Sequence, residues 1–319
     1  MLPTVTVIIV NWNGGTMLKE CLLHLTKQTY IPSCIMVMDN GSTDGSDIYA
    51  EEVAGVTLLR LGKNLGFAAA NNRALEKCDT DFVALLNPDA FAEPVWLEKL
   101  IYAAQSYPDV AAFGSRQLIH GSIDQLDGIG DIYHISGLVW RNGYGRTQTN
   151  ADLITREIFS PCAGAVLYSR DVLQQLGGFD EDYFCYVEDV DLGFRLRLAG
   201  YQSIYVPDAV VHHVGSATTG GHHSDFSVYH GHRNLVWTFL KNMPGILFLA
   251  LLPLHVFLNI ISIIYFVIIG KGRLIIRSKK DAIKGIPVML KKRRTIQKNR
   301  RSSIYDIWRV LDKRVFPSR

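Results

Sequence analysis

The stretch Val83-Ala84-Leu85-Leu86-Asn87-Pro88-Asp89-Ala90 decides the fold. Its apolar residues predict a buried strand, and Pro88 ends that strand because proline cannot donate to a sheet ladder. Asp89 is therefore expected at the carboxyl end of a central strand, just before a helix predicted over residues 93–104. Ligands bind at that edge of open α/β sheets, where an aspartate suits a divalent cation carrying a diphosphate. The octapeptide alone leaves open the alternative that Asp89 only caps the next helix.

The residues before this stretch alternate between strand and helix patterns. β-Branched and apolar runs predict strands over 5–10, 35–38 and 56–61, and helical spacing of apolar residues predicts helices over 18–25 and 68–77. Strands and helices that alternate at short spacing are typical of βαβ units. The sequence therefore predicts an α/β fold built on a parallel sheet.

Polar and glycine-rich segments follow the first three predicted strands. They are Asn11-Trp12-Asn13-Gly14-Gly15, Asp39-Asn40-Gly41-Ser42-Thr43-Asp44-Gly45 and Gly62-Lys63-Asn64-Leu65-Gly66-Phe67. A parallel sheet does not need polar residues at these positions, whereas a nucleotide lying across the sheet edge would use them. For Asp39, an Asx turn is the simpler structural alternative.

The charge of the chain is divided unevenly along its length. The net charge is +3 over 319 residues, but residues 1–240 carry −12 and residues 241–319 carry +15. An acidic globular part followed by a basic tail indicates a catalytic or binding domain with a membrane-surface anchor. We accordingly expect a catalytic domain over 1–240 and a membrane-associated segment over 241–319.

The cysteines and the N-terminus point to a reduced, cytosolic catalytic domain. The five cysteines at positions 21, 34, 78, 162 and 185 form no Cys-x-x-Cys pair, which favours neither a zinc site nor a disulfide framework. The N-terminus enters a strand within a few residues and has no basic region, so no signal peptide is expected.

Three carboxylates crowd together in Glu188-Asp189-Val190-Asp191, at the start of a helix predicted to end at Gly200. Like charges this close raise one another's pKa, which suits a general base. The alternative is that all three simply occupy a helix N-terminus, where acidic residues are favoured. Asp191 is expected to cap that helix.

Two further segments are predicted strands that carry site residues. In Phe159–Leu167 the small residues would let a sugar approach the backbone, or would serve helix-on-sheet packing. In Tyr205–Ser216 the adjacent His212 and His213 must point to opposite faces, so only one can reach a site. The polar stretches 120–130 and 141–150 are expected to line one side of a cleft.

The order of these motifs resembles the inverting family 2 glycosyltransferases of the glycosyltransferase-A fold, and within them the bacterial rhamnosyltransferase-like enzymes. The matching pieces are VIIVNWN, VMDNGSTDGS, KNLGFAAANN, LLNPDA and YVEDVDLGFRLRLAG, within residues 4–240. The resemblance implies a nucleotide-binding sheet flanked by helices. It also implies a nucleoside diphosphate sugar donor, with dTDP or UDP as the carrier and Mg²⁺ or Mn²⁺ as the cofactor.

Carried over to this chain, the resemblance assigns nucleotide-sugar binding to the strand ends. Asp39 would hydrogen-bond the nucleobase, Asn64 and Gly66 would lie near the nucleoside, and Asp89 would bind the metal that bridges the phosphates. The remaining predicted donor-binding residues are Asn11, Asn87 and Arg233. Many relatives have Asp-x-Asp where this chain has Asn87-Pro88-Asp89, so one carboxylate is missing here.

The same resemblance assigns the chemistry to the later motifs. Asp189 would be the general base and Glu188 would help to orient the acceptor. His213 is the histidine expected to complete the metal shell. Arg233 is expected to stabilise the leaving diphosphate, with a phospholipid contact as its alternative, and residues 220–223 and 229–234 are expected to form a lid.

The C-terminal segment carries an uncharged apolar run over 246–269, long enough to cross a bilayer. Basic residues flank both ends, so a kinked or re-entrant helix at the cytosolic face fits the charges better than a simple crossing. Packing on a soluble domain is the alternative. Ile304, Ile307, Trp308, Leu311 and Val315 share one helical face, which predicts a helix lying in an anionic interface. Nucleic acid is not an expected partner.

The sequence therefore predicts a metal-dependent inverting glycosyltransferase at the cytoplasmic face of the cell membrane. The acceptor would be a lipid-linked saccharide in cell-surface polysaccharide synthesis, and the resemblance names L-rhamnose as a donor sugar. Two alternatives remain open. One is a nucleotidyltransferase, which would be expected to carry a Gly-rich loop with a basic residue after the first strand. The other is a non-catalytic membrane scaffold that keeps the fold.

Overall fold

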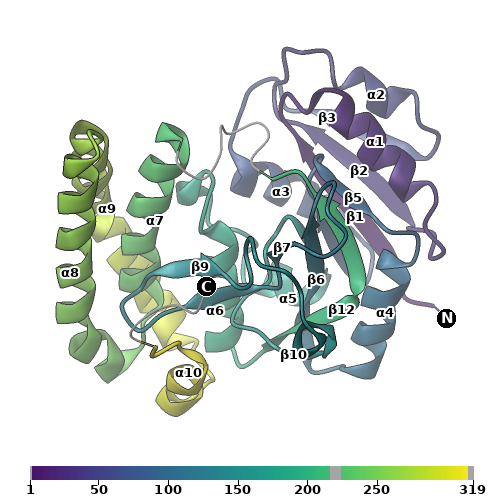
Figure 1. Cartoon of the computed structure of the whole chain (residues 1–319). Helices are drawn as coiled ribbons and strands as arrows, with labels where there is room; N and C mark the ends of the chain where they lie inside the picture. The colour runs from purple at the N-terminus through teal and green to yellow at the C-terminus, as the bar shows by residue number, and fades with distance from the viewer. Residues whose placement is uncertain (1, 216–223, 315–319) are drawn as a thin grey trace.

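A computed structural model describes residues 2–215 and 224–314 (Figure 1). One half of its central sheet is parallel and follows the chain from the N-terminus. Strand β1 (Val5–Asn11) lies between β2 (Cys34–Asp39) and β4 (Phe82–Leu86), and β3 (Val56–Arg60) pairs with β2 at the edge. The predicted parallel sheet is confirmed over these strands.

The other half of the sheet mixes strand directions. β11 (Ala165–Ser169) is antiparallel to both β4 and β6 (Val110–Ile119), and β12 (Gln202–His213) runs parallel to β6. The short strands here are β5 (Ala90–Ala92), β7 (Leu126–Gly128) and β10 (Arg156–Glu157), and a separate hairpin joins β8 (Asp131–Tyr133) to β9 (Val139–Arg141). The antiparallel β11 therefore joins the two parallel parts into one sheet.

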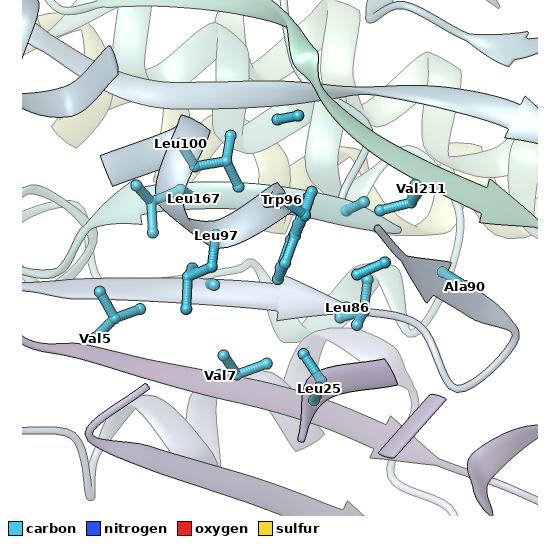
Figure 2. Packing of buried hydrophobic residues seen from close by; sticks show 14 of the residues in the cluster. Val5, Val7, Leu25, Leu86, Ala90, Trp96, Leu97, Leu100, Leu167 and Val211 are labelled. Carbon is cyan, nitrogen blue, oxygen red and sulfur yellow. The ribbon is translucent and has the colours of Figure 1, made fainter. Parts of the chain in front are cut away.

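Helices cover both faces of the sheet because alternate strand residues point to opposite sides. Val5 and Val7 pack with α1 (Gly15–Leu25) and α4 (Trp96–Ser106) in the cluster drawn in Figure 2. Ile8 faces the other way, towards α3 (Phe67–Leu75), α5 (Arg170–Gln175) and α6 (Glu188–Leu198). A short α2 (Ile48–Glu51) and two 3₁₀ turns, Asn150–Leu153 and Glu181–Tyr183, complete this part.

The chain changes partners at Pro88. β4 ends at Leu86, and after the proline the chain forms β5, in which Ala90 pairs with His213 of β12. The amide of Val214 also donates to the carbonyl of Asp89. The break predicted at Pro88 is therefore present, and the predicted helix is α4, but the short strand β5 lies between Asp89 and that helix. This strand brings Asp89 beside the end of β12.

A layer of four helices follows the sheet, at the opposite end of the molecule from α1 and α2 (Figure 1). Its members are α7 (Asp225–Asn242), α8 (Gly245–Ile268), α9 (Gly272–Lys298) and α10 (Ile304–Val310). Within the described residues, α8 is the one helix that is long and apolar enough to cross a membrane. It continues through Pro253 without a break, and the domain boundary at 240/241 falls at the last turn of α7.

The last helix differs from its prediction. Ile307 and Leu311 of the predicted membrane-facing side are buried against Tyr133, Phe194 and Phe239. Partly buried Ile304 and Trp308 pack against the same cluster, and Val315 lies outside the described residues. The apolar face of α10 therefore belongs to the protein core, because α6 and α7 leave an apolar surface that it covers.

Candidate active site

A cavity of about 390 Å³ lies where the carboxyl ends of the sheet strands meet the turn before α6. It collects residues that are far apart in the sequence, including ten of interest here: Trp12, Asn40, Asn64, Asn87, Asp89, Asp131, Arg141, Glu188, Asp189 and His213. The edge of the sheet predicted to bind a ligand is therefore hollowed, and the predicted Asp89, Glu188, Asp189 and His213 all line the same space.

Asp89 and His213 meet at one end of the cavity. His213 Nε2 lies 3.3 Å from Asp89 Oδ1, an ionic contact without the alignment of a hydrogen bond. His213 Nδ1 lies 2.8 Å from Asp127 Oδ2, which fixes the orientation of the ring. The neighbouring His212 instead turns to the other face, towards Glu93. The structure thus brings His213, and not His212, to the cavity.

The electrostatics of His213 follow from these two carboxylates. Burial opposes the charged imidazole, but the contacts with Asp127 and Asp89 outweigh it and raise the pKa of His213 to about 9. The pKa of Asp127 is lowered, because its bond to His213 and the charge of Arg141 outweigh the effect of burial. The two acids and the cationic ring therefore stabilise one another.

These residues fit a divalent cation in part. A histidine whose Nδ1 is held by a carboxylate and whose Nε2 lies beside a second carboxylate is a common arrangement around metals. Within residues 2–215 and 224–314, however, no cluster of three or more His, Cys, Asp or Glu side chains could hold a metal ion by itself. Asp89 and His213 would thus supply two ligands, with the remainder coming from phosphate oxygens and water.

Glu188 and Asp189 line the same cavity from the first turn of α6. Asp189 accepts hydrogen bonds from the amides of Ala163 (3.1 Å) and Val190 (2.8 Å). Glu188 is buried, and its Oε2 has no hydrogen-bond partner in the described part of the chain. Burial raises the pKa of both groups, and for Asp189 the two amides and Arg141 oppose that rise. Asp189 is therefore the better-stabilised anion of the pair.

The turn that presents these acids has an unusual backbone. Phe184, Tyr186 and Val187 all have positive φ angles, between 65° and 69°, a region that β-branched residues such as valine rarely adopt. Asn234 of α7 is fully buried, and its Nδ2 donates to the carbonyls of Tyr183, Cys185 and Tyr186 at 2.8–3.0 Å. This one amide therefore fixes the turn. Such strain is characteristic of functional sites.

Asp191 has a different role from the one predicted for it. It does not cap α6; its carboxylate is fully buried and accepts from Arg195 Nε (2.9 Å), Asn242 Nδ2 (2.7 Å) and Tyr183 Oη (3.2 Å). Lys241 Nζ lies 2.7 Å from it. Asp191 therefore links α6 to α7, because its position two residues after Asp189 places it on a different face of the helix.

The predicted donor-binding residues at the strand ends form a connected network. Asn11 Nδ2 donates to Asp39 Oδ1 (3.1 Å), and Asp39 Oδ2 accepts from the amide of Ser42 (3.2 Å). Both are buried and neither lines the cavity, and the bond to Ser42 spans three residues, one more than the Asx turn that was the structural alternative for Asp39. The nucleobase contact of Asp39 and the donor contact of Asn11 remain predictions.

Asn64 and Gly66 do line the cavity, and their loop is held by Asn40. Asn40 Nδ2 donates to Asn64 Oδ1 (3.0 Å), and the amide of Gly66 donates to the same oxygen (2.9 Å). Gly66 has φ +86°, and a Cβ there would lie 2.5 Å from the carbonyl oxygen of Phe184. Glycine is thus required, because the nucleotide side and the strained turn touch here.

The segment 159–167 packs against α6 and also lines the cavity, and the approach of a sugar to its backbone stays a prediction. Ser160 is buried against α6, where a Cβ on Gly193 would lie 2.3 Å from Ser160 Oγ. Cys162, Ala163 and Gly164 line the cavity. The first part therefore serves helix packing, and the second keeps the cavity open.

Arg233 lies away from the cavity lining. Its guanidinium donates to the carbonyls of Asp182 (3.1 Å) and Tyr183 (2.8 Å) and stacks over Trp237 at 4.3 Å. The structure therefore does not bring Arg233 together with the other predicted site residues. Residues 229–234 belong to helix α7, and the predicted lid residues 220–223 lie outside the described residues.

Sequence reasoning missed the charged residues of the segment 107–155. Asp127 and Asp131 flank a turn after β7, and Arg141 at the end of β9 donates to Asp127 Oδ2 at 2.6 Å. Burial and the nearby Asp189 raise the pKa of Asp131 to about 8. Two aspartates four residues apart in Asp127-Gly128-Ile129-Gly130-Asp131 could have been noticed, whereas nothing local marks Arg141.

Comparison with known proteins agrees with this geometry. The family model described as glycosyl transferase family 2 matches residues 6–177. The chain is 31% identical over 267 residues to the N-acetylglucosaminyl-diphospho-decaprenol L-rhamnosyltransferase of Mycobacterium tuberculosis, covering 74% of this chain and 87% of that protein. It is also 27% identical to an O-antigen chain rhamnosyltransferase of Salmonella typhimurium, over 66% of each chain.

Solved structures share the fold at low sequence identity. A mannosyltransferase from Pyrobaculum calidifontis, in complex with GDP-Man and Mn²⁺, aligns with a TM-score of 0.54 at 18% identity, covering 97% of this chain and 88% of that one. GalNAc-T7 with UDP, GalNAc and Mn²⁺ aligns with a TM-score of 0.57 at 18% identity, over 66% of this chain and 43% of that one. The predicted glycosyltransferase-A type fold is thereby confirmed, and the chain belongs to glycosyl transferase family 2.

Proposed function

We propose that this glycosyltransferase moves L-rhamnose from a dTDP-activated donor to a lipid-linked saccharide, with inversion at the anomeric carbon. The observation that carries the proposal is the pairing of two sites in one cavity. Asp89 and His213 form one pair in its lining, and Glu188 and Asp189 form the other. A phosphate-binding side facing a general-base side is what a single displacement on a nucleoside diphosphate sugar requires.

The substrate class is supported by the relatives and by the charge of the chain. The mycobacterial relative is named for a rhamnosyl transfer to a diphospho-decaprenol acceptor, and the Salmonella relative for O-antigen synthesis. The basic C-terminal part, with +15 over residues 241–319, suits anionic lipid headgroups at the cytoplasmic face of the cell membrane. Residues 1–240 would form the catalytic domain that this part holds there.

Asp189 is the proposed general base. Its hydrogen bonds to the amides of Ala163 and Val190 favour the carboxylate, whereas nothing in the described residues stabilises the Oε2 of Glu188. Asp189 takes the proton from the acceptor hydroxyl as that oxygen bonds to the anomeric carbon and the diphosphate leaves with the bonding electrons. Glu188 lies next to Asp189 and would help to orient the acceptor.

The leaving diphosphate would lie at the Asp89 and His213 side. A divalent cation, Mg²⁺ or Mn²⁺, held by these two residues would supply charge neutralisation for the phosphates. Asp127 keeps the His213 ring in place through its bond to Nδ1. Asn87 and Gly164 lie close together in the lining of the same cavity, and we expect the sugar to lie against them.

Release of nucleoside diphosphate by the detergent-solubilised full chain tests the proposal. The donors are dTDP-rhamnose and a set of UDP-sugars, with Mg²⁺, Mn²⁺ or a chelator, and with an N-acetylglucosaminyl-diphospho-polyprenol acceptor. We expect release from dTDP-rhamnose that depends on both the acceptor and the metal. Release from another donor alone would replace rhamnose by that sugar.

The Asp189→Asn variant, with Asp171→Asn as its matched control, separates the enzyme from the scaffold alternative. Asp171 has 81% of its side chain exposed and lies far from the cavity lining. An enzyme loses turnover with the first change and keeps nucleotide binding, and the control is unaffected. Folded wild-type protein that binds nucleotide but releases none from any donor would contradict the proposed reaction.

A further inference from the structure

Helix α8 divides lengthwise into two faces. Its outer face is solvent-exposed and carries no charged residue; apart from Tyr265, its side chains are apolar: Ile246, Leu249, Ala250, Pro253, Val256, Phe257, Ile260, Ile261, Ile264, Val267 and Ile268. At 1.5 Å per residue this face is about 33 Å long. Soluble proteins rarely expose a continuous apolar surface of this size, so the outer face indicates a contact with a partner or a membrane.

The inner face of α8 is bound to the protein along its length by polar contacts. His255 Nδ1 lies 2.7 Å from the Ser136 carbonyl, Asn259 Oδ1 accepts from Lys279 Nζ of α9 at 2.6 Å, and Ser262 Oγ lies 3.1 Å from His232 Nδ1 of α7. Because these contacts are spread over two turns, α8 lies flat against α7 and α9. It cannot leave them without exposing buried polar groups.

The neighbouring α9 continues the apolar surface and then changes to positive charge. Ile276 and Ile283 lie one turn before and after Lys279, which contacts α8, and both are exposed together with Leu290. The next positions around α9 carry exposed basic residues: Arg273, Arg277, Lys280, Lys284 and Lys291. An apolar strip bordered by a row of cations matches the cross-section of an anionic lipid surface.

From this arrangement we infer that α8 lies in the plane of an anionic membrane surface and does not cross it. The outer face of α8 with Ile276, Ile283 and Leu290 would enter the apolar layer, and the basic row of α9 would contact the headgroups. A crossing is disfavoured because α9 lies alongside α8 and would carry its cations into the bilayer. The inference rests on the membrane attachment in the proposed function, and its test uses no transfer reaction.

The position of this surface also fits the proposed acceptor. α7 joins the two regions: its Asn234 holds the turn that presents Glu188 and Asp189, and its His232 contacts α8. α8 stands on the outside of the helical layer (Figure 1). An in-plane α8 would therefore hold the acceptor side of the cavity at a fixed height above the lipid, where a lipid-linked saccharide can reach it.

Depth measurements on the full chain distinguish the in-plane helix from a crossing. An environment-sensitive fluorophore is attached at Leu249→Cys, Val256→Cys and Val267→Cys, and the signal of the unsubstituted chain is subtracted. Vesicles contain phosphatidylcholine with about one-third phosphatidylglycerol and lipids with quenchers at several depths. We expect the same shallow depth at all three positions, about 5–10 Å into the headgroup and acyl boundary. A deep Val256 between two shallow ends would overturn the inference in favour of a crossing.

Vesicle flotation tests the basic row. We expect Lys280→Glu with Lys284→Glu to reduce binding to the anionic vesicles at least about tenfold. The matched pair Lys27→Glu with Lys77→Glu, exposed on the sheet domain, should leave it unchanged. Equal vesicle binding of all variants would overturn the inference. It would also be overturned if no lipid quencher reached the fluorophores on α8 and the mass of the protein were twice that of one chain. The second result would show that another copy of the chain covers the outer face.

Discussion

Two sets of carboxylates within the first turn of α6 have opposite surroundings. Glu188 and Asp189 face the cavity, and burial raises the pKa of both. Asp191 is also fully buried, but Lys241 and Arg195 outweigh that burial and lower its pKa. The sequence shows three similar acids, whereas the fold turns two towards the substrate and one towards cations.

The difference shows how the protein supports a strained, charged turn. On the structural side, Lys241 Nζ also lies 2.5 Å from Asp180 Oδ2, and Lys292 of α9 bonds Asp180 and Asp182. These pairs join the segment before α6 to the C-terminal helices. On the cavity side, burial and the charge of Asp189 raise the pKa of Glu188. Stability is concentrated on one side of the turn and reactivity on the other.

The largest expected effect is the loss of turnover when Asp189, on the cavity side of the α6 turn, is replaced. Asp189→Asn keeps the size of the side chain but removes the base, so turnover should fall about 10⁴-fold. The melting temperature and nucleotide binding should stay close to those of the wild type. Steady-state rates and a nucleotide titration measure these quantities. A variant that keeps a tenth of the wild-type rate would remove Asp189 from the base role.

The corresponding change on the structural side should act on stability instead. Lys241→Met leaves Asp191 and Asp180 buried without their shared ammonium, which should lower the free energy of unfolding by about 3 kcal/mol. Turnover per folded molecule should change little at a temperature where the variant is folded. Urea unfolding with activity measured on the folded fraction tests this. The exposed Lys77→Met is the matched control, and an unchanged unfolding midpoint for Lys241→Met would contradict the role of the pair.

A smaller effect on turnover is expected from Asn234, which holds the turn before α6. Asn234→Leu has similar volume but removes the amide that donates to the carbonyls of Tyr183, Cys185 and Tyr186. The turn would relax from its positive φ angles, so kcat should fall about tenfold while the donor KM stays near its wild-type value. The exposed Asn299→Leu serves as the control. A pure loss of stability with normal kcat would make Asn234 structural only.

The same comparison explains what could be predicted from the sequence. The strand ends were predictable because β-branched runs and the stop at Pro88 are local signals, and Asp89 followed from them. Alternation along one strand predicted that only one of His212 and His213 could reach the site, and the choice of His213 came from the resemblance. Arg141 and Asp127 reach the cavity through the β8–β9 hairpin and the turn after β7, and no local pattern encodes that approach. Two partners of Asp191, Lys241 and Asn242, lie about 50 residues away on α7.

For helix α10 and Arg233, the sequence predicted the wrong partner. The apolar face of α10 was read as a membrane surface, since periodicity shows that a face is apolar and not what covers it. Arg233 carries a charge suited to a phosphate, but the carbonyls of Asp182 and Tyr183 bind its guanidinium. A local pattern therefore predicts the chemistry of a residue better than its partner.

The smallest expected effect is a pH dependence of opposite sign on the two sides. Burial and the charge of Asp189 raise the pKa of Asp131 to about 8, above its unfolded value, so the folded state binds the extra proton and loses stability as pH rises from about 4 to 8. Asp131→Asn removes this titration, and its melting temperature should exceed that of the wild type by about 2 °C at pH 8 and by less at pH 5.

For Asp180, Lys241 and Lys292 outweigh burial and lower the pKa, so the stability that Asp180 contributes is present above about pH 4 and is lost on acidification. Asp180→Asn should therefore lower the melting temperature at pH 7 and lower it less at pH 3. Thermal unfolding of both variants across this pH range measures the two signs. If the melting-temperature differences of the two variants from the wild type changed with pH in the same direction, the proposed opposition between the two sides of the α6 turn would be wrong.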